Sequence, residues 1–461
     1  MAANRLVTAA AANLLIPVSG LLVSPFLSRE LGPEGRGLYA ALTLPIVVCG
    51  WLGTYGLQDA LTFHVRQRRL SRRDAARVSL LAAVPLGLAA VLLLGVLSLF
   101  VFDRAGGERQ QFVVLALLAP LHLLANLVIG VLTGASDVGG VNLMKAGPAA
   151  LRTILLVVAC VAVDLSAFWA ALLFLTSTAS GILFGLPRLR HRAGPPTRAE
   201  PEGQAGPARA DPIPTRSLVR YSLACLPGVL AATSSARLDQ VVGLPLLGAR
   251  ELGLYAVAVS VAELPTAVAT AARTVLMGGA GGGEDRASML LVSRVAVAVA
   301  ALGCAVLAAG AGVLVPWFFG VAFAPAALPT VILCAATVVF TCVQVCTALL
   351  LADGRAARSS AALVAGSLTG VLLLVVLAPL GAVGAAVASL IGYAVAAGLA
   401  ARWVRRLPGV SSLRAVTVPY AADLRHLRAW LAGARRSRRT TPPEGRDAAG
   451  SRSAGSGGRA G

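Results

Sequence analysis

Charged residues are scarce in this 461-residue chain: they make up 13% of the sequence, and Lys145 is the only lysine. Apolar residues reach 57%, and the mean hydropathy is +0.80. So few charges do not cover soluble domains of this size, which are normally about a quarter charged. The composition therefore excludes an ordinary soluble protein and predicts an all-α, polytopic membrane protein.

Motifs for metal or catalytic chemistry are also missing. All seven cysteines fall inside apolar runs without a Cys-x-x-Cys pair, and Cys342 and Cys346 have the i,i+4 spacing of a helix face. No Asp-x-Asp, His-Glu-x-x-His or Walker-type glycine loop occurs. A membrane glycosyltransferase or polymerase needs positioned acids, bases or a metal on a sizeable loop. We therefore expect no enzymatic activity, no cofactor and no metal.

The net charge of +20 comes from arginines that cluster between apolar runs and in the C-terminal segment. Such clusters are typical of membrane topology, so we expect no nucleic-acid partner. If the amino terminus is cytoplasmic, one set of loops is strongly basic and the opposite set is not, which predicts that both termini are cytoplasmic. The basic set includes Arg66–Arg77, Lys145, Arg152, Arg286, Arg294, Arg355 and Arg358; the opposite set carries Arg29, Arg36, Arg104, Arg109 and Arg250.

Twelve stretches are apolar and long enough to cross a bilayer, which takes about 20 residues. They divide evenly around a polar segment at 188–216, which has too little apolar surface to fold. The sequence predicts two six-helix bundles (1–187 and 217–404), a flexible basic cytoplasmic linker (188–216) and a basic, partly disordered cytoplasmic tail (405–461). The predicted spans are 6–27, 38–61, 78–102, 112–133, 149–163, 167–186, 218–247, 254–277, 289–315, 326–352, 360–380 and 382–404.

An internal repeat supports two bundles of the same orientation. Segment 28–40 reads SRELGPEGRGLYA and segment 247–256 reads LGARELGLYA, so Gly-Leu-Tyr-Ala recurs with an offset of 216 (255 − 39). Both copies lie between the first and second spans of their bundle, on the predicted outer side. We expect the glycines to form a tight outer turn and the tyrosines to lie at the membrane interface. Parallel repeats of this kind are a known transporter plan.

The chain resembles bacterial polysaccharide and oligosaccharide flippases, the Wzx-type branch of the multidrug/oligosaccharidyl-lipid/polysaccharide exporter superfamily. The resemblance lies in FLSRELGPEGRGLYAALTLP, GLQDALTFHV and RLDQVVGLPLLGARELGLYAVAVSVAELP. It implies two bundles around a cavity that opens alternately to each side of a bacterial plasma membrane. It also implies a polyprenyl-pyrophosphate-linked oligosaccharide as cargo, with membrane lipids and other polysaccharide-assembly proteins as partners. The alternative within the superfamily is a cation-coupled multidrug exporter.

Charged residues inside a span are costly and are therefore candidate functional residues. Counted from the predicted helix ends, Arg237, Asp239 and Glu263 lie roughly 12–15 Å below the outer surface. Arg237 is a candidate substrate ligand, because a guanidinium offers paired donors to a pyrophosphate. Asp239 or Glu263 is a candidate site for the H+ or Na+ that drives transport. A structural ion pair between helices is the alternative for all three.

Uncharged polar residues inside the other spans are further candidates for substrate binding. His122 and Asn126 have i,i+4 spacing in the fourth span, where they line the cavity or form hydrogen bonds between helices. Asn13 and Gln344 are candidates of the same kind.

Two prolines occupy corresponding spans of the two bundles. Pro45 lies in the second span and Pro265 in the eighth. Because proline frees a backbone carbonyl inside a helix, we predict bends at both positions.

Overall fold

The structure is a computed structural model. It describes residues 2–67, 69–102, 107–190, 215–270, 272–273, 276, 286–407, 410, 412, 414–418 and 420, with the backbone alone for 2–17 and for some later helical positions. Every element in the described residues is helical, which confirms the all-α class, and all of them belong to one unit, Met1–Thr417. Most of the predicted linker (191–214) and most of the tail lie outside the described residues.

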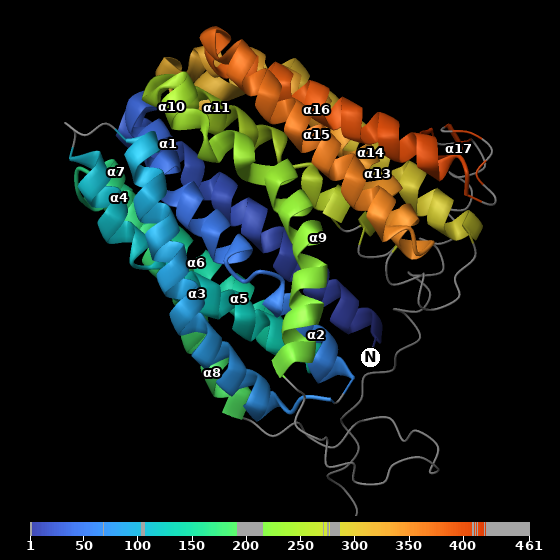
Figure 1. Cartoon of the computed structure of the whole chain (residues 1–461). Helices are drawn as coiled ribbons and strands as arrows, with labels where there is room; N and C mark the ends of the chain where they lie inside the picture. Colours follow the sequence, from blue (N-terminus) through green and yellow to red (C-terminus); the bar gives the residue numbers. More distant parts are fainter. Residues whose placement is uncertain are drawn as a thin grey trace, which may run out of the picture. The chain divides into compact units, whose positions relative to one another are not determined.

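The first half of the chain forms one bundle, in which α3 packs on α5, and α6 packs on α1 and α8. The backbone of α1 kinks at Gly32, so this single element contains the first predicted span and most of the second. The elements are α1 (Ala2–Leu52), α2 (Leu57–Arg66), α3 (Arg72–Val101), α4 (Glu108–Ala116), α5 (Ala119–Gly134), α6 (Val138–Ala162), α7 (Ala167–Ala179) and α8 (Gly181–Arg190) (Figure 1).

The second half forms the other bundle, in which α14 packs on α13 and α16, and α15 packs on α9 and α16. Three residues predicted to belong to the tail are buried in the core of this bundle: Leu407, Val410 and Val416. The elements are α9 (Thr215–Val241), α10 (Gly243–Leu247), α11 (Ala249–Ala262), α13 (Arg286–Phe319), η1 (Val321–Ala326), α14 (Ala327–Ala352), α15 (Ala356–Leu377), η2 (Ala378–Leu380), α16 (Gly381–Val404) and α17 (Arg414–Thr417).

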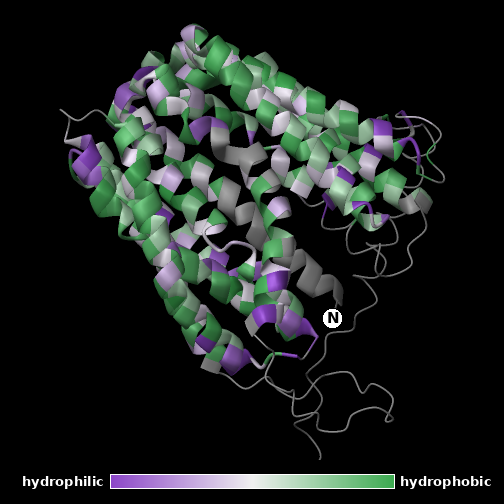
Figure 2. Cartoon of the chain, in the orientation of Figure 1, coloured by the Kyte–Doolittle hydropathy of each residue, from purple (hydrophilic) through white to green (hydrophobic). Residues whose placement is uncertain are grey.

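Each predicted span corresponds to one helix or to consecutive helices. By length and composition, eight segments of the described residues are able to cross a membrane, and two of these, Val18–Leu52 and Ala356–Val404, contain parts of two predicted spans. Hydrophobic residues cover the middle of the bundles, whereas hydrophilic residues gather toward their ends (Figure 2). On α3, for example, Leu81 and Val84 are 75% and 73% exposed, as expected for side chains that face lipid.

The fifth span differs most from its prediction. It was predicted at 149–163, but α6 runs from Val138 to Ala162 and begins where the Asp137 side chain accepts a hydrogen bond from Gly140 N. Lys145 and Arg152, predicted in an inner loop, therefore lie inside a helix. Glycine and polar residues in the first half of α6 lower its hydropathy, which hides this half from a hydropathy reading.

Only one of the two predicted proline bends is found. Pro45 lies inside α1, whose backbone is helical there, and the break comes instead after Leu52, where Tyr55 and Gly56 have positive φ angles of 47° and 78°. In the second bundle α11 does end before Pro265. The second and eighth spans are thus both interrupted, but at positions that the repeat does not relate.

Helices α1 and α11 cross at the glycines of the repeat. A Cβ atom on Gly37 would lie 1.7 Å from the carbonyl oxygen of Ala249, and one on Gly253 would lie 1.9 Å from that of Pro33. The two contacts are related by the repeat, since both pairs are offset by 216 (253 − 37 and 249 − 33). The glycine turn lies earlier in each copy of the repeat, at Gly32 and Gly248, whose φ angles are 63° and 81°. Gly37 and Gly253 instead serve the close approach of two helix backbones. We call this side of the molecule the crossing end.

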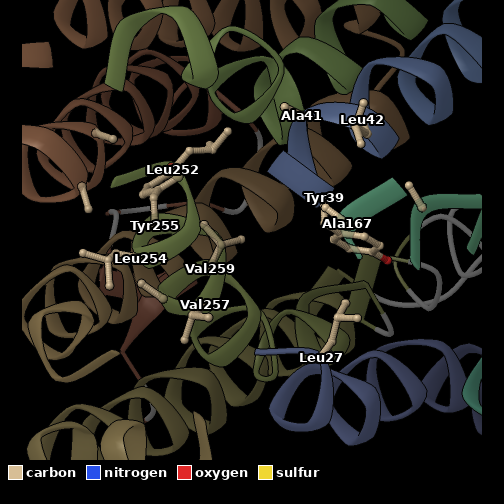
Figure 3. Close-up of a cluster of buried hydrophobic side chains, with 14 of the residues drawn as sticks. Leu27, Tyr39, Ala41, Leu42, Ala167, Leu252, Leu254, Tyr255, Val257 and Val259 are labelled. Atoms are coloured by element: carbon tan, nitrogen blue, oxygen red, sulfur yellow. The ribbon is translucent and has the colours of Figure 1, made fainter. Parts of the chain in front are cut away.

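The tyrosines of the repeat are not at a membrane interface. Tyr39 and Tyr255 are 7% and 1% exposed and belong to the apolar cluster beside the crossing, on α1 and α11 (Figure 3). That cluster takes residues from both bundles, for example Ile46 and Leu374.

At the opposite, basic end, where the loop 66–73 lies, the bundles have separate cores. One core consists of first-bundle residues together with residues from the start of α9, and the other consists of second-bundle residues alone. At this end α9 contacts α2: the rings of Phe63 and Tyr221 stack at 4.5 Å, and Ser222 Oγ donates to Tyr55 O at 2.7 Å. The bundles are therefore joined along the crossing end and meet through α9 toward the basic end.

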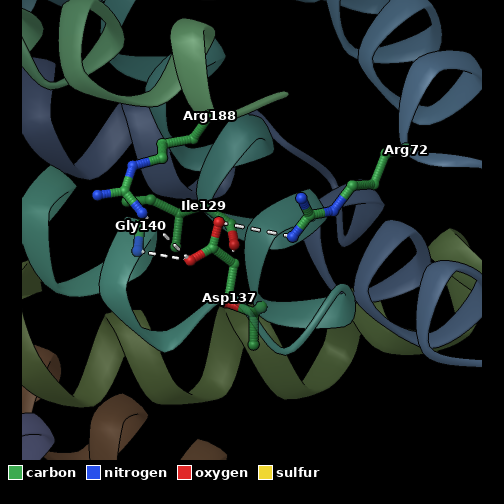
Figure 4. Close-up of polar contacts among 6 residues, drawn as sticks. Arg72, Ile129, Asp137, Gly140 and Arg188 are labelled. Carbon is green, nitrogen blue, oxygen red and sulfur yellow. Dashed lines mark hydrogen bonds and ion pairs between the residues drawn. The ribbon is translucent and has the colours of Figure 1, made fainter. Parts of the chain in front are cut away.

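Asp137 ties three helices together at the basic end of the first bundle (Figure 4). Its Oδ1 accepts from Gly140 N at 2.8 Å, which caps α6. Arg72 at the start of α3 and Arg188 in α8 approach its two oxygens at 3.5 and 3.8 Å.

We expect Asp137→Ala to destabilise the protein by about 1–2 kcal/mol, mainly because α6 loses its N-terminal cap. Asp137→Asn keeps a capping oxygen and loses only partly exposed ion pairs, so its cost is expected below about 1 kcal/mol. Thermal unfolding in detergent measures both variants. Equal losses would show that the ion pairs, rather than the cap, carry the stabilisation.

Candidate functional site

Asp239 lies two residues before the end of α9 and is held by hydroxyl groups from two other helices. Its Oδ2 accepts hydrogen bonds from Tyr255 Oη of α11 and from Ser389 Oγ of α16, the latter at 3.3 Å. The two hydroxyl oxygens are 2.9 Å apart. Gln240 N donates to Oδ1 at 2.8 Å. A carboxylate is thus fixed in place inside the second bundle.

The carboxylate opens onto a pocket among α9, α14, α15 and α16. Small residues such as Gly366 and Gly392 let α15 and α16 approach each other closely. Of the described residues that line the pocket, Asp239 alone is charged. A carboxylate with nearby hydroxyl groups in apolar surroundings suits a proton or a small cation. The pocket is lined by Asp239, Phe340, Val343, Leu363, Gly366, Ser367, Gly370, Val371, Leu374, Ala385, Ala388, Ser389, Gly392, Tyr393 and Ala396.

The sequence predicted that Glu263 and Asp239 lie at the same depth in the membrane, but in the structure their depths differ. Asp239 contacts Tyr255, and Glu263 follows Tyr255 by eight residues, about 12 Å along a helix. The depths differ because the seventh span is interrupted: α9 ends at Val241, and α10 is a separate short helix. Glu263 instead lies at the end of α11, where its carbonyl oxygen accepts from Thr266 Oγ1 at 2.5 Å.

The side chain of Arg237 lies outside the described residues, as does that of Asn13. The structure shows another cation in the predicted eighth span, Arg273, which is half-buried. Its Nη1 donates to Gln344 Oε1 at 3.0 Å and lies 3.5 Å from Thr347 Oγ1. No described carboxylate forms an ion pair with Arg273. The signal was visible in the sequence, because Arg273 falls within 254–277, four residues from the predicted inner end.

His122 and Asn126 lie on α5 against the end of α1. Asn126 Nδ2 donates to Gly50 O at 3.0 Å, next to the break after Leu52, which favours the structural alternative for this residue. His122 is 4% exposed, and its Nδ1 bonds to Leu118 O of its own helix at 3.1 Å. Its buried Nε2 has no hydrogen-bond partner in the described part of the chain.

The predicted site residues therefore do not form one cluster in the described structure. Asp239 lies in the second-bundle pocket, Gln344 pairs with Arg273 toward the basic end, and His122 and Asn126 belong to the first bundle. The result is a carboxylate near the crossing end and a cation nearer the basic end.

No protein-family model and no curated protein sequence matches this chain. Solved structures do share its fold. A multidrug resistance MATE family transporter of the MOP superfamily in an inward-facing conformation has a TM-score of 0.65 at 18% identity, covering 88% of this chain and 99% of that one. Such a transporter in an outward-facing conformation has a TM-score of 0.55 at 18% identity, and the match covers 88% of this chain and 97% of that one. The lipid II flippase MurJ in an inward closed conformation has a TM-score of 0.66 at 11% identity, and the match covers 92% of this chain and 93% of that one.

These similarities confirm the predicted twelve-helix fold of two bundles. At such identities they establish the fold alone.

Proposed function

We propose that this chain is a non-enzymatic membrane transporter that works by alternating access. Its cargo is a polyprenyl-pyrophosphate-linked oligosaccharide, moved from the inner to the outer leaflet of a bacterial plasma membrane for cell-surface polysaccharide synthesis. The observation that supports transport is the pair of repeat-related bundles, joined across Gly37 and Gly253 at one end and separately packed at the other. Such bundles exchange access by rocking about the region between them.

The direction of opening follows from the charges. The basic end carries the loop with Arg66, Arg69, Arg72 and Arg73, and basic loops stay in the cytoplasm. With both termini cytoplasmic, the end at which the cores are separate faces the cytoplasm. This is the side on which a lipid-linked sugar is assembled before its transfer.

Arg273 favours a cargo with an anionic headgroup. Arg273 is a half-buried guanidinium in a span, bonded to a neutral glutamine and without a carboxylate partner among the described residues. A planar guanidinium binds two oxygens of a pyrophosphate at once. We assign the same role to Arg237, and supporting polar contacts to Gln344, His122 and Asn13.

Ion coupling is assigned to Asp239, with Glu263 as the second candidate carboxylate. Asp239 faces a pocket whose other described lining residues are uncharged and include hydroxyl groups, and binding of H+ or Na+ neutralises the carboxylate. Its bond to Tyr255, two residues from Gly253 at the crossing, links ion occupancy to the joint between the bundles.

The test is leaflet transfer of a fluorescent polyprenyl-pyrophosphate sugar in vesicles that contain the purified protein. We expect Arg273→Gln and Arg237→Ala each to lower the transfer rate by at least about tenfold, the size of a lost charge-assisted contact. Arg402→Gln, which removes an exposed arginine of α16, is the control and retains native transfer. Native transfer rates in both Arg273→Gln and Arg237→Ala would contradict the proposed phosphate-binding role.

A cation-coupled multidrug exporter is the second candidate, favoured by the carboxylate pocket around Asp239. It predicts uptake of cationic dyes into vesicles against an ion gradient, without lipid transfer. That result would replace the cargo proposed above while leaving the alternating-access scheme in place.

A further inference from the structure

Arg36 is a buried cation next to the crossing. It is 8% exposed, its Cζ lies 5.0 Å from the ring centroid of Tyr39, and its Nη2 donates to Ser24 Oγ at 3.3 Å. Within the described part of the chain, its Nε is buried without a hydrogen-bond partner, and so is the hydroxyl of Ser28, which is 0% exposed. Ser28 follows Ser24 by four residues and shares its face of α1. Two buried donors on this side of the bundle are therefore unsatisfied.

A second cation, Arg152 of α6, lies in the same region. Its Nη2 donates to Ser19 Oγ of α1 at 2.8 Å, and its Cζ is 5.2 Å from the ring centroid of Phe174. The rings of Tyr39 and Phe174 meet edge to face at 5.9 Å, so the two guanidinium groups flank one aromatic pair. No described carboxylate forms an ion pair with either arginine.

The repeat shows that this charge is not required by the scaffold. The position equivalent to Arg36 is Leu252 (252 − 36 = 216), which is 0% exposed. The two equivalent tyrosines also have opposite neighbours: Tyr39 lies beside a guanidinium, whereas Tyr255 bonds to the carboxylate of Asp239. The first bundle thus carries positive charge where the second bundle carries negative charge.

A buried guanidinium without a counter-charge costs several kcal/mol. We propose that the first bundle binds a small inorganic anion of the halide class at Arg36, with Arg36 Nε and the Ser28 hydroxyl as donors and Arg152 as a nearby positive charge. Because these donors are almost fully enclosed, the proposed ligand is a single compact anion rather than a pyrophosphate headgroup, which is much larger. The anion is distinct from the proposed cargo and from the cation at Asp239.

The test is thermal unfolding of the full-length protein in detergent, with sodium chloride titrated against sodium gluconate so that sodium stays constant. A ligand that binds only the folded state raises the unfolding temperature in a saturable way. We expect such a rise for the native protein and for Arg402→Gln, which removes an exposed arginine. For Arg36→Gln we expect the chloride-dependent rise to disappear. For Ser28→Ala, a milder change, we expect the apparent chloride affinity to fall by about tenfold.

Three results would overturn the proposal. One is the absence of any saturable chloride effect on the native protein. Another is an unchanged chloride effect in both Arg36→Gln and Ser28→Ala. If Arg36→Gln does not fold, an unchanged chloride effect in Ser28→Ala alone has the same meaning. The third is stronger stabilisation by sodium pyrophosphate than by chloride, lost in Arg36→Gln, which would assign the site to a cargo headgroup.

Discussion

Gly37→Ala is expected to reduce leaflet transfer by more than about tenfold, the largest effect that we predict for a single methyl group. The added Cβ would lie 1.7 Å from the carbonyl oxygen of Ala249, where no side chain is able to move aside. Helices α1 and α11 must separate, and the conformation joined at the crossing end is then disfavoured. Because alternating access needs both conformations, the cycle slows even though neither the cargo site nor the ion site has changed.

The chain offers a matched control for this change. Gly20→Ala makes the same substitution in α1, at a position where a Cβ would have nothing within 4 Å, and native transfer is expected. Gly253→Ala is the repeat-related variant, and we expect it to reproduce the loss. Equal transfer rates for Gly37→Ala and Gly20→Ala would show that the crossing does not separate and re-form during transport.

A buried reporter distinguishes this effect from simple misfolding. Ala41 is 1% exposed beside the crossing. Four of the seven native cysteines are buried and the other three are partly exposed, so labelling is measured relative to the native protein. An Ala41→Cys variant is therefore expected to resist a membrane-impermeant maleimide in the otherwise native protein. Combined with Gly37→Ala it is expected to become labelled, provided that the protein still elutes as a single species in size-exclusion chromatography.

The membrane-spanning helices could be predicted from the sequence, because a chain that crosses a bilayer needs a long apolar segment at each crossing. The span boundaries were less readable where a helix contains glycine and polar residues. The first half of α6 is such a case, and for that reason Lys145 was placed in a loop and the span was predicted to begin only at 149. The proximity of Arg36 and Arg152 depends on helix packing, which hydropathy does not encode.

The repeat was recognised in the sequence, but its role was not. Gly-Leu-Tyr-Ala is compatible with a turn or with a helix, and local sequence does not decide between them. The decision comes from a partner segment 216 residues away, which requires a residue without a side chain at the contact. Asp239 was likewise found as a buried charge, whereas its partners Tyr255 and Ser389 were visible only in three dimensions.

Asp239→Asn is expected to abolish transport driven by an ion gradient, with a loss of at least about a hundredfold, because the amide neither binds a proton nor neutralises a cation. The substitution preserves the shape of the side chain, so folding and equilibrium exchange of cargo between leaflets should continue. The measurement is cargo accumulation in vesicles with and without an imposed H+ or Na+ gradient. Asp164→Asn is the control, since Asp164 is an exposed carboxylate between α6 and α7, and we expect native accumulation for it.

The gradient dependence also distinguishes the ion site from the cargo site. An Asp239→Asn protein that transfers cargo slowly but responds normally to a gradient would contradict the coupling role and place Asp239 among the cargo ligands. In that case Glu263, the second candidate carboxylate for ion coupling, is the residue to test next. Loss of the gradient response in Asp239→Asn alone would instead tie the ion to the pocket that Asp239 and Ser389 line.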